Sequence, residues 1–393
     1  MGGLGARKGI STLTEMDEKI IDPVSRELLL AELTPDRKLC DTNKADNEIY
    51  VVDCNDAPNV LQEIGRLREI AFRDSGGGTG RSVDLDEFDM DPAHPYKQLI
   101  IWDPEANAIL GGYRYILGPD IQLQADGQPH ITSSHMFHYS EQFIQDYLPH
   151  VMELGRSFVA PEYQSSKAGA KAIFALDNLW DGIAAVILGH PGILYFLGKM
   201  TIYPSYDKTC RELIQHFLWK HFPDPEELAR PKRPVPVESD ERLLNLVLRD
   251  EDYKADYRNL KEAVRKLGFN IPPLVNSYMN ASPTMKMLGT GINDEFFDCY
   301  DTGIMISFEE MYADKRDRHK VPYFKYLATR IRLRFPGLRT ELEDLVERIS
   351  AKKENDRVRN FSAFLNRQRG KVRAAEKNLR RRVRRLKKEK VEP

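Results

Sequence analysis

The chain has 393 residues, of which 41% are hydrophobic and 30% charged, and its formal net charge is only −2. This length and apolar fraction suffice for a hydrophobic core in one large domain or two ordinary ones, which excludes collagen-like, disulfide-scaffold and wholly disordered proteins. Cys40, Cys54, Cys210 and Cys299 lack CxxC or metal-ligand spacing, which predicts reduced thiols in a cytoplasm-like compartment and no structural zinc.

The first predicted elements follow a polar N-terminal segment. Residues 1–46 contain several glycines and one short helical pattern, which predicts a loosely ordered arm. No apolar run follows the basic residues Arg7 and Lys8, so a secretory signal is not expected. A β-rich run at 48–53 and apolar residues at helical spacing over 60–73 then predict a strand and a helix that open the folded core.

Two further β-rich runs follow a Gly-rich and then acidic stretch. The runs at 97–103 and 109–117 flank a segment with turn chemistry, DPEANA, so we expect them to pair as a hairpin. The apolar patterns beyond them predict a strand at 151–163, a helix at 167–189, a strand at 192–202 and a helix at 206–221. This order of elements predicts an α/β layer with a central mixed sheet.

No segment of the sequence is expected to span a membrane. The most apolar stretch, 182–202, is interrupted by His190, Pro191 and Lys199 well short of the length that a bilayer core demands. We interpret it as the end of a buried helix, a turn and a buried strand.

The C-terminal half begins with a Pro-rich segment, 223–238, whose five prolines predict a linker or an extended excursion. Beyond it the sequence predicts a charged helix at about 240–267, a β-like run at 302–307 and helices to residue 350. We therefore divide the chain into an arm at 1–46, a core at 47–222, a Pro-rich linker at 223–238, a mainly helical part of the same unit at 239–350 and a basic tail at 351–393.

The near-zero net charge hides an asymmetry at the C-terminus. Residues 352–393 hold 17 Lys and Arg against five Asp and Glu, a charge of +12, which leaves −14 for residues 1–351. The tail has few apolar positions, which favours a solvated, partly frayed helix. The functional alternative is attraction to anionic lipid or an acidic protein, and no motif of specific nucleic-acid recognition accompanies the charges.

Two loop motifs that precede the hairpin carry candidate chemistry. SGGGTG at 75–80 has neither dinucleotide-binding nor P-loop spacing, which favours a surface loop over an anion-binding one. DLDEFDMD at 84–91 lacks the Gly and the Glu of a calcium loop, so no metal site is expected. Its carboxylates either form a solvated loop or face inward, where they pair with arginines or receive a substrate ammonium group.

Two strand motifs add further candidates. Arg114 lies within the β-rich run GGYRYIL, where it is either a snorkelling edge residue or a buried partner of those carboxylates. In ELGRSFV, Glu153 and Arg156 are three apart and would face opposite ways on an ideal strand. A bulge at Gly155 would turn both toward one cleft and free a backbone N–H as an oxyanion donor.

Taken in order, these motifs resemble a known family. The blocks GGGTG, DLDEFD, YKQLIIWD, GGYRY, ELGRSFVAPEY, LWDGI and YFLGKMTIYPSY are similar to those of the N-acyltransferases of ornithine and glycine lipid synthesis, the hemolysin-like acetyltransferase family. These enzymes are related to the acyl-homoserine-lactone synthases, and both are variants of the GNAT acyltransferase fold. The resemblance covers about 48–320. It implies an α/β, GNAT-like fold with a central mixed sheet flanked by helices and a C-terminal helical extension.

The resemblance implies transfer of a 3-hydroxyacyl group from acyl carrier protein to the α-amine of a small amino acid, ornithine or glycine. In that reaction Glu153, directly or through water, would accept the amine proton, and the strand near Gly155 and Arg156 would supply oxyanion donors. The substrate-binding positions carried over are Arg68, Phe72, Asp84, Asp86, Asp89 and Arg114. Whether the three arginines grip the acceptor's carboxylate or lock the aspartates in place stays open at this point.

The donor site departs from the usual GNAT pattern. The pyrophosphate loop is represented by residues 164–169, with Lys167 where a glycine is expected. This favours an acyl carrier protein over coenzyme A as the donor. The phosphopantetheine arm of the carrier protein would then lie near Ser165 and Ser166, and Lys167 and the basic tail would be the positive charges on which the acidic carrier protein docks. No bound cofactor is expected. The partners are then acyl carrier protein, a small amino acid and an anionic membrane surface.

The expected location is the cytoplasm, with peripheral contact at the inner membrane face if the product is a lipid. Two alternatives remain at this stage. One is an acyl-homoserine-lactone-type signal synthase, and the other is a non-catalytic module that binds carrier protein or lipid.

Overall fold

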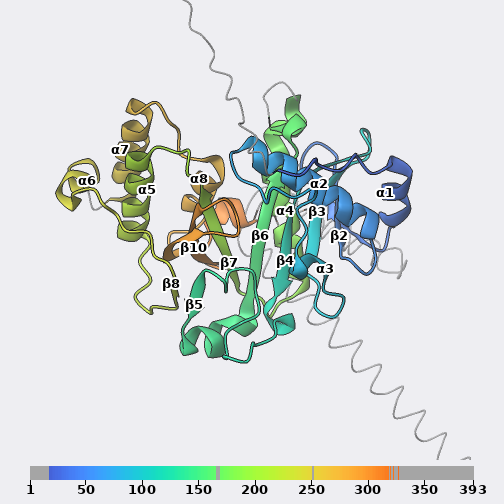
Figure 1. The fold of residues 1–393 in the computed structure, drawn as a ribbon, viewed down its shortest axis with the longest axis horizontal. Coiled ribbons are helices and arrows are strands. Elements are labelled where there is room, and N and C mark those ends of the chain that lie inside the picture. The colour runs from blue at the N-terminus through green and yellow to red at the C-terminus, as the bar shows by residue number, and fades with distance from the viewer. Residues whose placement is uncertain are drawn as a thin grey trace, which may run out of the picture. The chain divides into compact units, whose positions relative to one another are not determined.

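The computed structural model describes residues 17–164, 169–249 and 252–317, together with 319, 322 and 326. Residues Met1–Tyr323 form one compact unit, and Phe324–Pro393 form a second. The predicted donor-binding residues Ser165, Ser166 and Lys167 and the predicted basic tail lie outside the described residues. Figure 1 shows the first unit as a central sheet with helices around it.

The core of the first unit is a mixed eight-stranded sheet in the order β1-β2-β3-β4-β6-β7-β10-β9. Neighbouring strands are antiparallel except β6 and β7, which run parallel. The strands are β1 (Lys38–Asp41), β2 (Glu48–Val52), β3 (Lys97–Asp103), β4 (Ala108–Leu117), β6 (Val151–Val159), β7 (Tyr195–Ile202), β9 (Lys286–Asn293) and β10 (Cys299–Ser307). The predicted hairpin is confirmed, since β3 pairs with β4 along its whole length.

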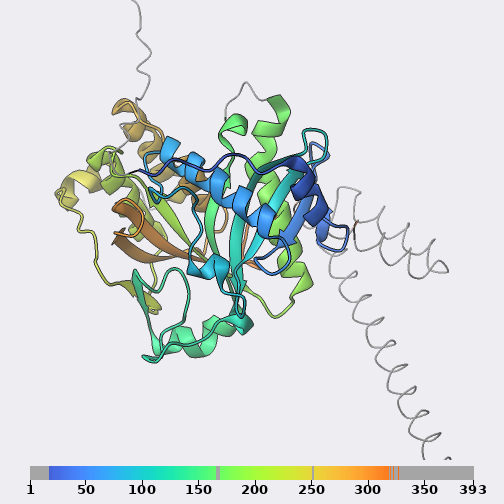
Figure 2. The same cartoon turned by 45° about the vertical axis from the view of Figure 1, so that its right-hand side comes forward.

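Two helices cover opposite faces of this sheet (Figure 1, Figure 2). On one face, α2 (Pro58–Asp74) packs its apolar side against Ile100 and Trp102 of β3. On the other face lies α4 (Gly169–Gly189), where a Cβ on Gly182 would come within 2.7 Å of Leu99, so the glycine permits close packing. Burial on both faces explains why β3 is an almost continuous apolar run. No described helix is both long and apolar enough to cross a membrane.

β6 and β7 separate soon after they begin to pair. Their parallel register covers only Val151–Glu153 of β6 and Tyr195–Leu197 of β7. Beyond that point, on the side that faces β7, the described part of the chain gives β6 no strand partner. The sheet therefore opens between its two central strands.

β6 carries a bulge on its other side, against β4. Gly155 lies opposite Arg114 and Phe158 opposite Gly112, so two residues of β6, Arg156 and Ser157, oppose only one residue of β4. Arg156 has φ 48°, a left-handed conformation that costs a non-glycine residue about 1 kcal/mol. The predicted bulge is confirmed, but Arg156 and not Gly155 adopts the unusual backbone conformation.

The described part of the N-terminal segment is ordered, contrary to the predicted arm. α1 (Arg26–Glu32) packs on α2, and β1 forms the edge of the sheet beside β2. Glu32 accepts hydrogen bonds from the backbone N–H groups of Asn59 and Val60, at 3.1 and 2.8 Å. These N–H groups belong to the first turn of α2, where a carboxylate is favoured by the helix dipole, so α1 is fixed to the core by a polar contact that the apolar pattern did not show.

The C-terminal half differs from its prediction in two places, and a third observation decides between two predicted alternatives. The Pro-rich segment contains β8 (Ala229–Pro231), which pairs with β5 (Phe137–Tyr139), so the predicted extended excursion is confirmed and the linker of the domain division is not. The single charged helix is two, because Asp252 caps a new helix through the Ala255 N–H. The part predicted as mainly helical adds β9 and β10 to the sheet, and its helices are α6 (Glu241–Val247), α7 (Tyr253–Lys266) and α8 (Pro273–Met279).

The remaining predicted elements within the described residues agree with the structure within a few residues, whereas the helices predicted up to residue 350 lie largely outside the described residues. The helix predicted at 206–221 is α5 (Lys208–His221), and α3 (Glu87–Met90) is a single turn inside the acidic motif. Asp86 accepts from the Asp89 N–H and Asp89 accepts from the Asp86 N–H, a reciprocal cap that folds the motif back on itself.

Candidate active site

A cavity of about 410 Å³ opens where β6 and β7 diverge. Its walls are Leu154–Val159 of β6, Lys199 and Thr201 of β7, and residues from α2, β4, β9, β10 and α8. Tyr113 and Arg114 are adjacent on β4 and therefore point to opposite faces of the sheet, yet both line the cavity. The cavity is thus lined from both faces of the sheet.

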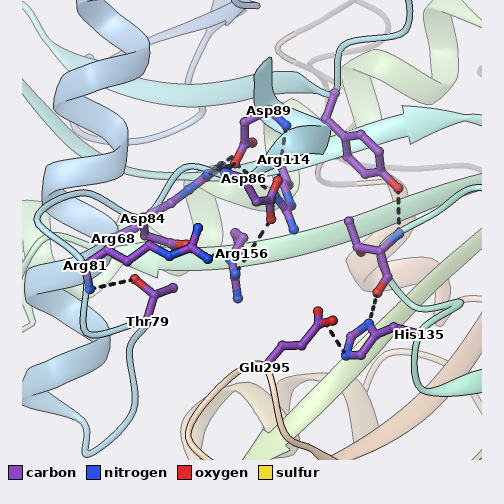
Figure 3. A network of polar contacts seen from close by, with 12 residues as sticks. Arg68, Thr79, Arg81, Asp84, Asp86, Asp89, Arg114, His135, Arg156 and Glu295 are labelled. Atoms are coloured by element: carbon purple, nitrogen blue, oxygen red, sulfur yellow. Dashed lines mark hydrogen bonds and ion pairs between the residues drawn. The ribbon is translucent and has the colours of Figure 1, made fainter. Parts of the chain in front are cut away.

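Beside the cavity, three arginines and three aspartates form a charge-balanced cluster that Figure 3 shows from close by. Arg68 Nη1 lies 3.2 Å from both carboxylate oxygens of Asp89, and its Nη2 donates to Gln98. Arg114 Nη1 lies 2.7 Å from both oxygens of Asp86 and 2.9 Å from Asp89 Oδ2. The acidic motif therefore faces inward, and its interpretation as a solvated loop is wrong.

Burial and pairing together set the protonation of this cluster. Burial lowers the pKa of Arg68, whereas Asp89 and Asp86 outweigh burial at Arg114 and raise its pKa. Burial would raise the pKa of Asp89, but Arg114 and Arg68 hold it well below its usual range. Burial dominates at Asp84 and raises its pKa, because its carboxylate has no hydrogen bond within the described structure and the opposing charges of Arg156, Arg68 and Arg114 do not outweigh burial.

The three arginines divide the two roles that the sequence left open. Arg68 is fully buried, does not line the cavity and locks Asp89. Arg114 lines the cavity, but its Nη1 already pairs with Asp86 and Asp89. Arg156 borders the cavity with its side chain 18% exposed, while its Nε lies 3.2 Å from Asp84. Arg156 is therefore the arginine most available to a ligand.

Phe72 and the glycine-rich loop shape the same wall. Phe72 lines the cavity and packs edge-on against Phe296 at 5.2 Å, and the Arg156 guanidinium lies 4.7 Å from the Phe296 ring centre. The loop is held by Glu69, which accepts from Thr79 and Gly80. A Cβ on Gly77 would come within 2.4 Å of Tyr203, so this glycine lets the loop pack on a cavity residue.

Glu153 does not reach the cavity, although the sequence singled it out as the proton acceptor. Its carboxylate is buried and takes four donors: Ser133 N–H (2.9 Å) and Ser133 hydroxyl at Oε1, and Tyr96 hydroxyl and Thr132 N–H (3.3 Å) at Oε2. Burial and Glu153 raise the pKa of Tyr96 far above its usual value, so this hydroxyl stays protonated and donates. All four acceptor positions of the carboxylate are filled. The geometry gives Glu153 a positioning role for the segment at 132–133, of which Thr132 lines the cavity.

Replacing Glu153 with Gln is therefore expected to lower the free energy of unfolding and to leave the chemical step unchanged. An amide presents two N–H donors where backbone or hydroxyl donors now point, which leaves buried donors unpaired at a cost of about 1–3 kcal/mol. Urea unfolding measures this loss. Activity measured against pH on the folded fraction should keep the wild-type profile, whereas a lost acid limb would restore Glu153 as the proton acceptor.

Gly155 lines the cavity, but the structure does not require a glycine there. A Cβ at this position would meet Arg114 Nε at 3.5 Å, an ordinary contact, and its φ is not in the left-handed region. The role predicted for Gly155 as an oxyanion donor thus rests on its backbone N–H alone.

Sequence reasoning missed a polar group on the opposite wall of the cavity. Asp301 of β10 is 2% exposed and lines the cavity with Lys199, Thr201 and Asn293. The signal in the sequence was one acidic residue directly before the β-like run at 302–307, but its partners lie 8 to 102 residues away. Among the described residues, no group of three His, Cys, Asp or Glu side chains is arranged to hold a metal ion.

Comparison with known proteins gave one family and two similar relatives. Residues 67–172 match the family model described as acetyltransferase (GNAT) domain, which confirms the predicted fold class. A glycine N(alpha)-acyltransferase of Bacteroides thetaiotaomicron is 57% identical over 303 residues, which are 77% of this chain and 89% of that protein. A glycine N(alpha)-acyltransferase of Phocaeicola vulgatus is 53% identical over 308 residues, which are 78% of this chain and 94% of that protein.

Among solved structures, a CoA-dependent acyl-homoserine lactone synthase, BjaI, aligns with 70% of this chain and 87% of its own. The TM-score is 0.29 and the identity 11%, a similarity too remote to bear on the site.

Proposed function

The chain belongs to the family of the glycine N(alpha)-acyltransferases and is itself an N-acyltransferase, and from that premise we propose that it transfers a 3-hydroxyacyl group from acyl carrier protein to the amino group of glycine. Glycine is preferred over ornithine because both relatives are named for it. The product would be an N-acyl glycine, the lyso form of a glycine lipid.

The observation that carries the proposal is the cavity between β6 and β7. N-acyl transfer needs two substrates to meet at one carbonyl carbon, and a cavity lined from both faces of the sheet provides a different wall for each of them. On the α4 face the cavity is lined by Tyr113, Tyr278 and the apolar segment 272–274. This side suits the acyl chain and its thioester arm.

On the α2 face, Arg156 supports binding of the acceptor's carboxylate. A guanidinium matches the planar geometry of a carboxylate, and Asp84 occupies only the Nε side of the Arg156 fork at close range. The strained φ of 48° places this side chain at the bulge, next to the gap between the strands. Backbone strain of this kind is typical of functional sites.

The edge of β6 supplies candidates for the oxyanion hole. Between Leu154 and Val159 the strand has no partner on its β7 side within the described residues, so N–H groups on that edge are open to the cavity. We assign the stabilisation of the tetrahedral oxyanion to this edge near Gly155 and Arg156, where fixed N–H dipoles need no reorganisation during the reaction.

The donor, the partners and the location belong to the proposal as well. An acyl carrier protein is favoured by Lys167 in place of the loop glycine, and Ser165, Ser166 and Lys167 would meet its phosphopantetheine arm. We place the enzyme in the cytoplasm, with the basic tail at an anionic membrane surface that receives the lipid product.

The test is an assay of the purified full chain with 3-hydroxyacyl carrier protein and either glycine or ornithine, followed by mass spectrometry of the acylated product. We expect N-acyl glycine as the main product and little turnover with the matching acyl-CoA. A preference for ornithine would contradict the acceptor, and equal rates with acyl-CoA would contradict the donor. Folded protein that forms no N-acyl product with either acceptor would overturn the proposed reaction.

A further inference from the structure

We propose that Asp301 is the subsite for the acceptor's amino group and the acceptor of its proton, an inference that rests on the function proposed above. It concerns the wall of the cavity opposite Arg156, built by β7, β9 and β10. Asp301 lies directly across from Thr201 in the β7–β10 register. Lys199 and Thr201, two apart on β7, share one face of the sheet and both contact Asp301.

The hydrogen bonds of Asp301 leave one acceptor position open. Thr201 hydroxyl donates to Oδ1 at 2.6 Å, Asn293 amide donates to Oδ2 at 2.8 Å, and Lys199 Nζ lies 3.1 Å from Oδ2. Oδ2 thus has two donors and Oδ1 has one among the described residues. Glu153, by contrast, has all four positions filled and does not line the cavity. Of the two buried carboxylates compared, Asp301 alone can take a proton from a ligand in the cavity.

The charges around the cavity fit a small zwitterion. Lys199 supplies the counter-charge that a buried carboxylate needs, and Asn293 is in turn oriented by His135, whose Nε2 lies 3.1 Å from its amide oxygen. Tyr203 also lines the cavity, and burial, Cys299 and Asp301 raise the pKa of its hydroxyl while Arg156 lowers it. An α-amino acid carries its two charges on neighbouring atoms of one short chain. Arg156 would then hold the carboxylate while Asp301 holds the amine.

The reaction step balances with these groups. The bound glycine first loses one ammonium proton, through Oδ1 of Asp301, to solvent, which frees the nitrogen lone pair. The lone pair then forms the new C–N bond to the thioester carbonyl carbon, and the C–S bond breaks. As the bond forms, the nitrogen becomes more acidic and its proton passes to Oδ1 of Asp301. The same proton then goes to the departing thiolate, which restores the carboxylate and leaves a free thiol and an amide.

The experiment compares wild type with D301N in the glycine assay over a range of pH. At neutral pH we expect kcat/KM for glycine to fall about 10²-fold to 10³-fold, the usual contribution of a positioned proton acceptor. The loss should shrink as pH rises toward the pKa of the amine, because more of the glycine is then already neutral. A purely structural role would leave the ratio of the two activities constant with pH. Asp301→Glu keeps a carboxylate and should retain the shape of the wild-type profile.

The matched control is D256N. Asp256 is also a buried aspartate with a lysine partner, Lys220 at 2.8 Å, but it lies on α7 outside the cavity. Its substitution should lower stability while kcat/KM of the folded enzyme stays within about twofold of wild type. If D301N does not fold, calorimetry of wild type with glycine and with acetate replaces it, since acetate has the carboxylate without the amine.

The outcomes separate this inference from the proposed function. Wild type that acylates glycine, with D301N impaired as described or with acetate bound at least tenfold more weakly than glycine, supports the subsite. Wild type that acylates glycine while D301N is unaffected or impaired equally at every pH overturns it, as does acetate bound as tightly as glycine. Wild type that acylates no amino acid overturns the proposed function first, whatever D301N shows.

Discussion

Replacing Asp89 with Asn is expected to lower the free energy of unfolding by about 3–5 kcal/mol, as is typical when one partner of a buried ion pair is removed. Asp89 is fully buried and bridges two guanidinium groups, those of Arg68 at 3.2 Å and Arg114 at 2.9 Å. An amide would leave Arg68, whose ion pair among the described residues is with Asp89, as a buried unpaired charge. Equilibrium unfolding in urea, followed by circular dichroism, measures the loss.

The pH dependence of stability provides a second measurement on the same pair. The folded-state pKa of Asp89 lies below its unfolded value of about 4. Its contribution is therefore fully present above pH 4 or so and is lost as pH falls through that value toward the folded pKa. D89N should remove part of this acid dependence. Asp84 has the opposite effect on the free energy of unfolding. Burial raises its folded-state pKa, so ionisation of its buried carboxyl group at higher pH lowers stability.

The control for Asp89 is its neighbour Asp91, which is only half-buried and accepts from the Ala93 N–H. D91N should change the free energy of unfolding by less than about 1 kcal/mol. Equal effects of the two substitutions would show that the Arg–Asp cluster does not dominate the stability of this region.

The second large effect is expected at Arg156. Arg156→Lys should lower kcat/KM for glycine about 10²-fold, mainly through a higher KM, because an ammonium cannot replace a planar fork that binds a carboxylate through two N–H groups. Such a loss corresponds to about 2.7 kcal/mol of binding free energy. The φ of 48° is equally strained for Lys and Arg, so backbone strain is the same in both proteins. Steady-state kinetics with varied glycine measures the effect.

Arg66→Lys is the matched control for that substitution. Arg66 on α2 forms a two-pronged pair with Glu63, at 2.6 and 2.8 Å, and is not part of the cavity wall. Its replacement should leave KM and kcat within about twofold of wild type. A wild-type KM for glycine in R156K would show that the acceptor's carboxylate binds elsewhere.

Much of the fold could be predicted because its signals are local. The helix of α2 and the β3–β4 hairpin follow from apolar spacing and turn residues within short windows, and the structure confirms both. The ordered blocks from the glycine loop to the end of β7 also sufficed to identify an N-acyltransferase. By contrast, β9 contains two glycines and little alternation, so its place in the sheet depends on pairing with β10.

The candidate site shows the same difference between features set by local sequence and features set by long-range contacts. Residue identity and spacing were enough to select Arg114 and the carboxylates of the acidic motif, since a charge inside an apolar pattern needs a partner nearby, and the family resemblance added Arg68. Spacing alone could not tell which arginine stays available, because that depends on which N–H groups the aspartates occupy. It also placed the strained residue of the bulge one position too early, at Gly155 instead of Arg156.

By itself, the sequence determined the central mixed sheet and the family, because each is encoded by neighbours along the chain. Only the tertiary structure decided that the aspartates of the acidic motif face inward and which carboxylate faces the cavity. Glu153 stands in the more suggestive motif, but Thr132, Ser133 and Tyr96, 20 to 57 residues away, fill every acceptor position of its carboxylate. Asp301 lies in a strand that contains no candidate site motif, yet the pairing of β10 with β7 brings it to the gap beside β6. Hydrogen-bond saturation and strand pairing depend on long-range contacts, and these form only when the sheet is assembled.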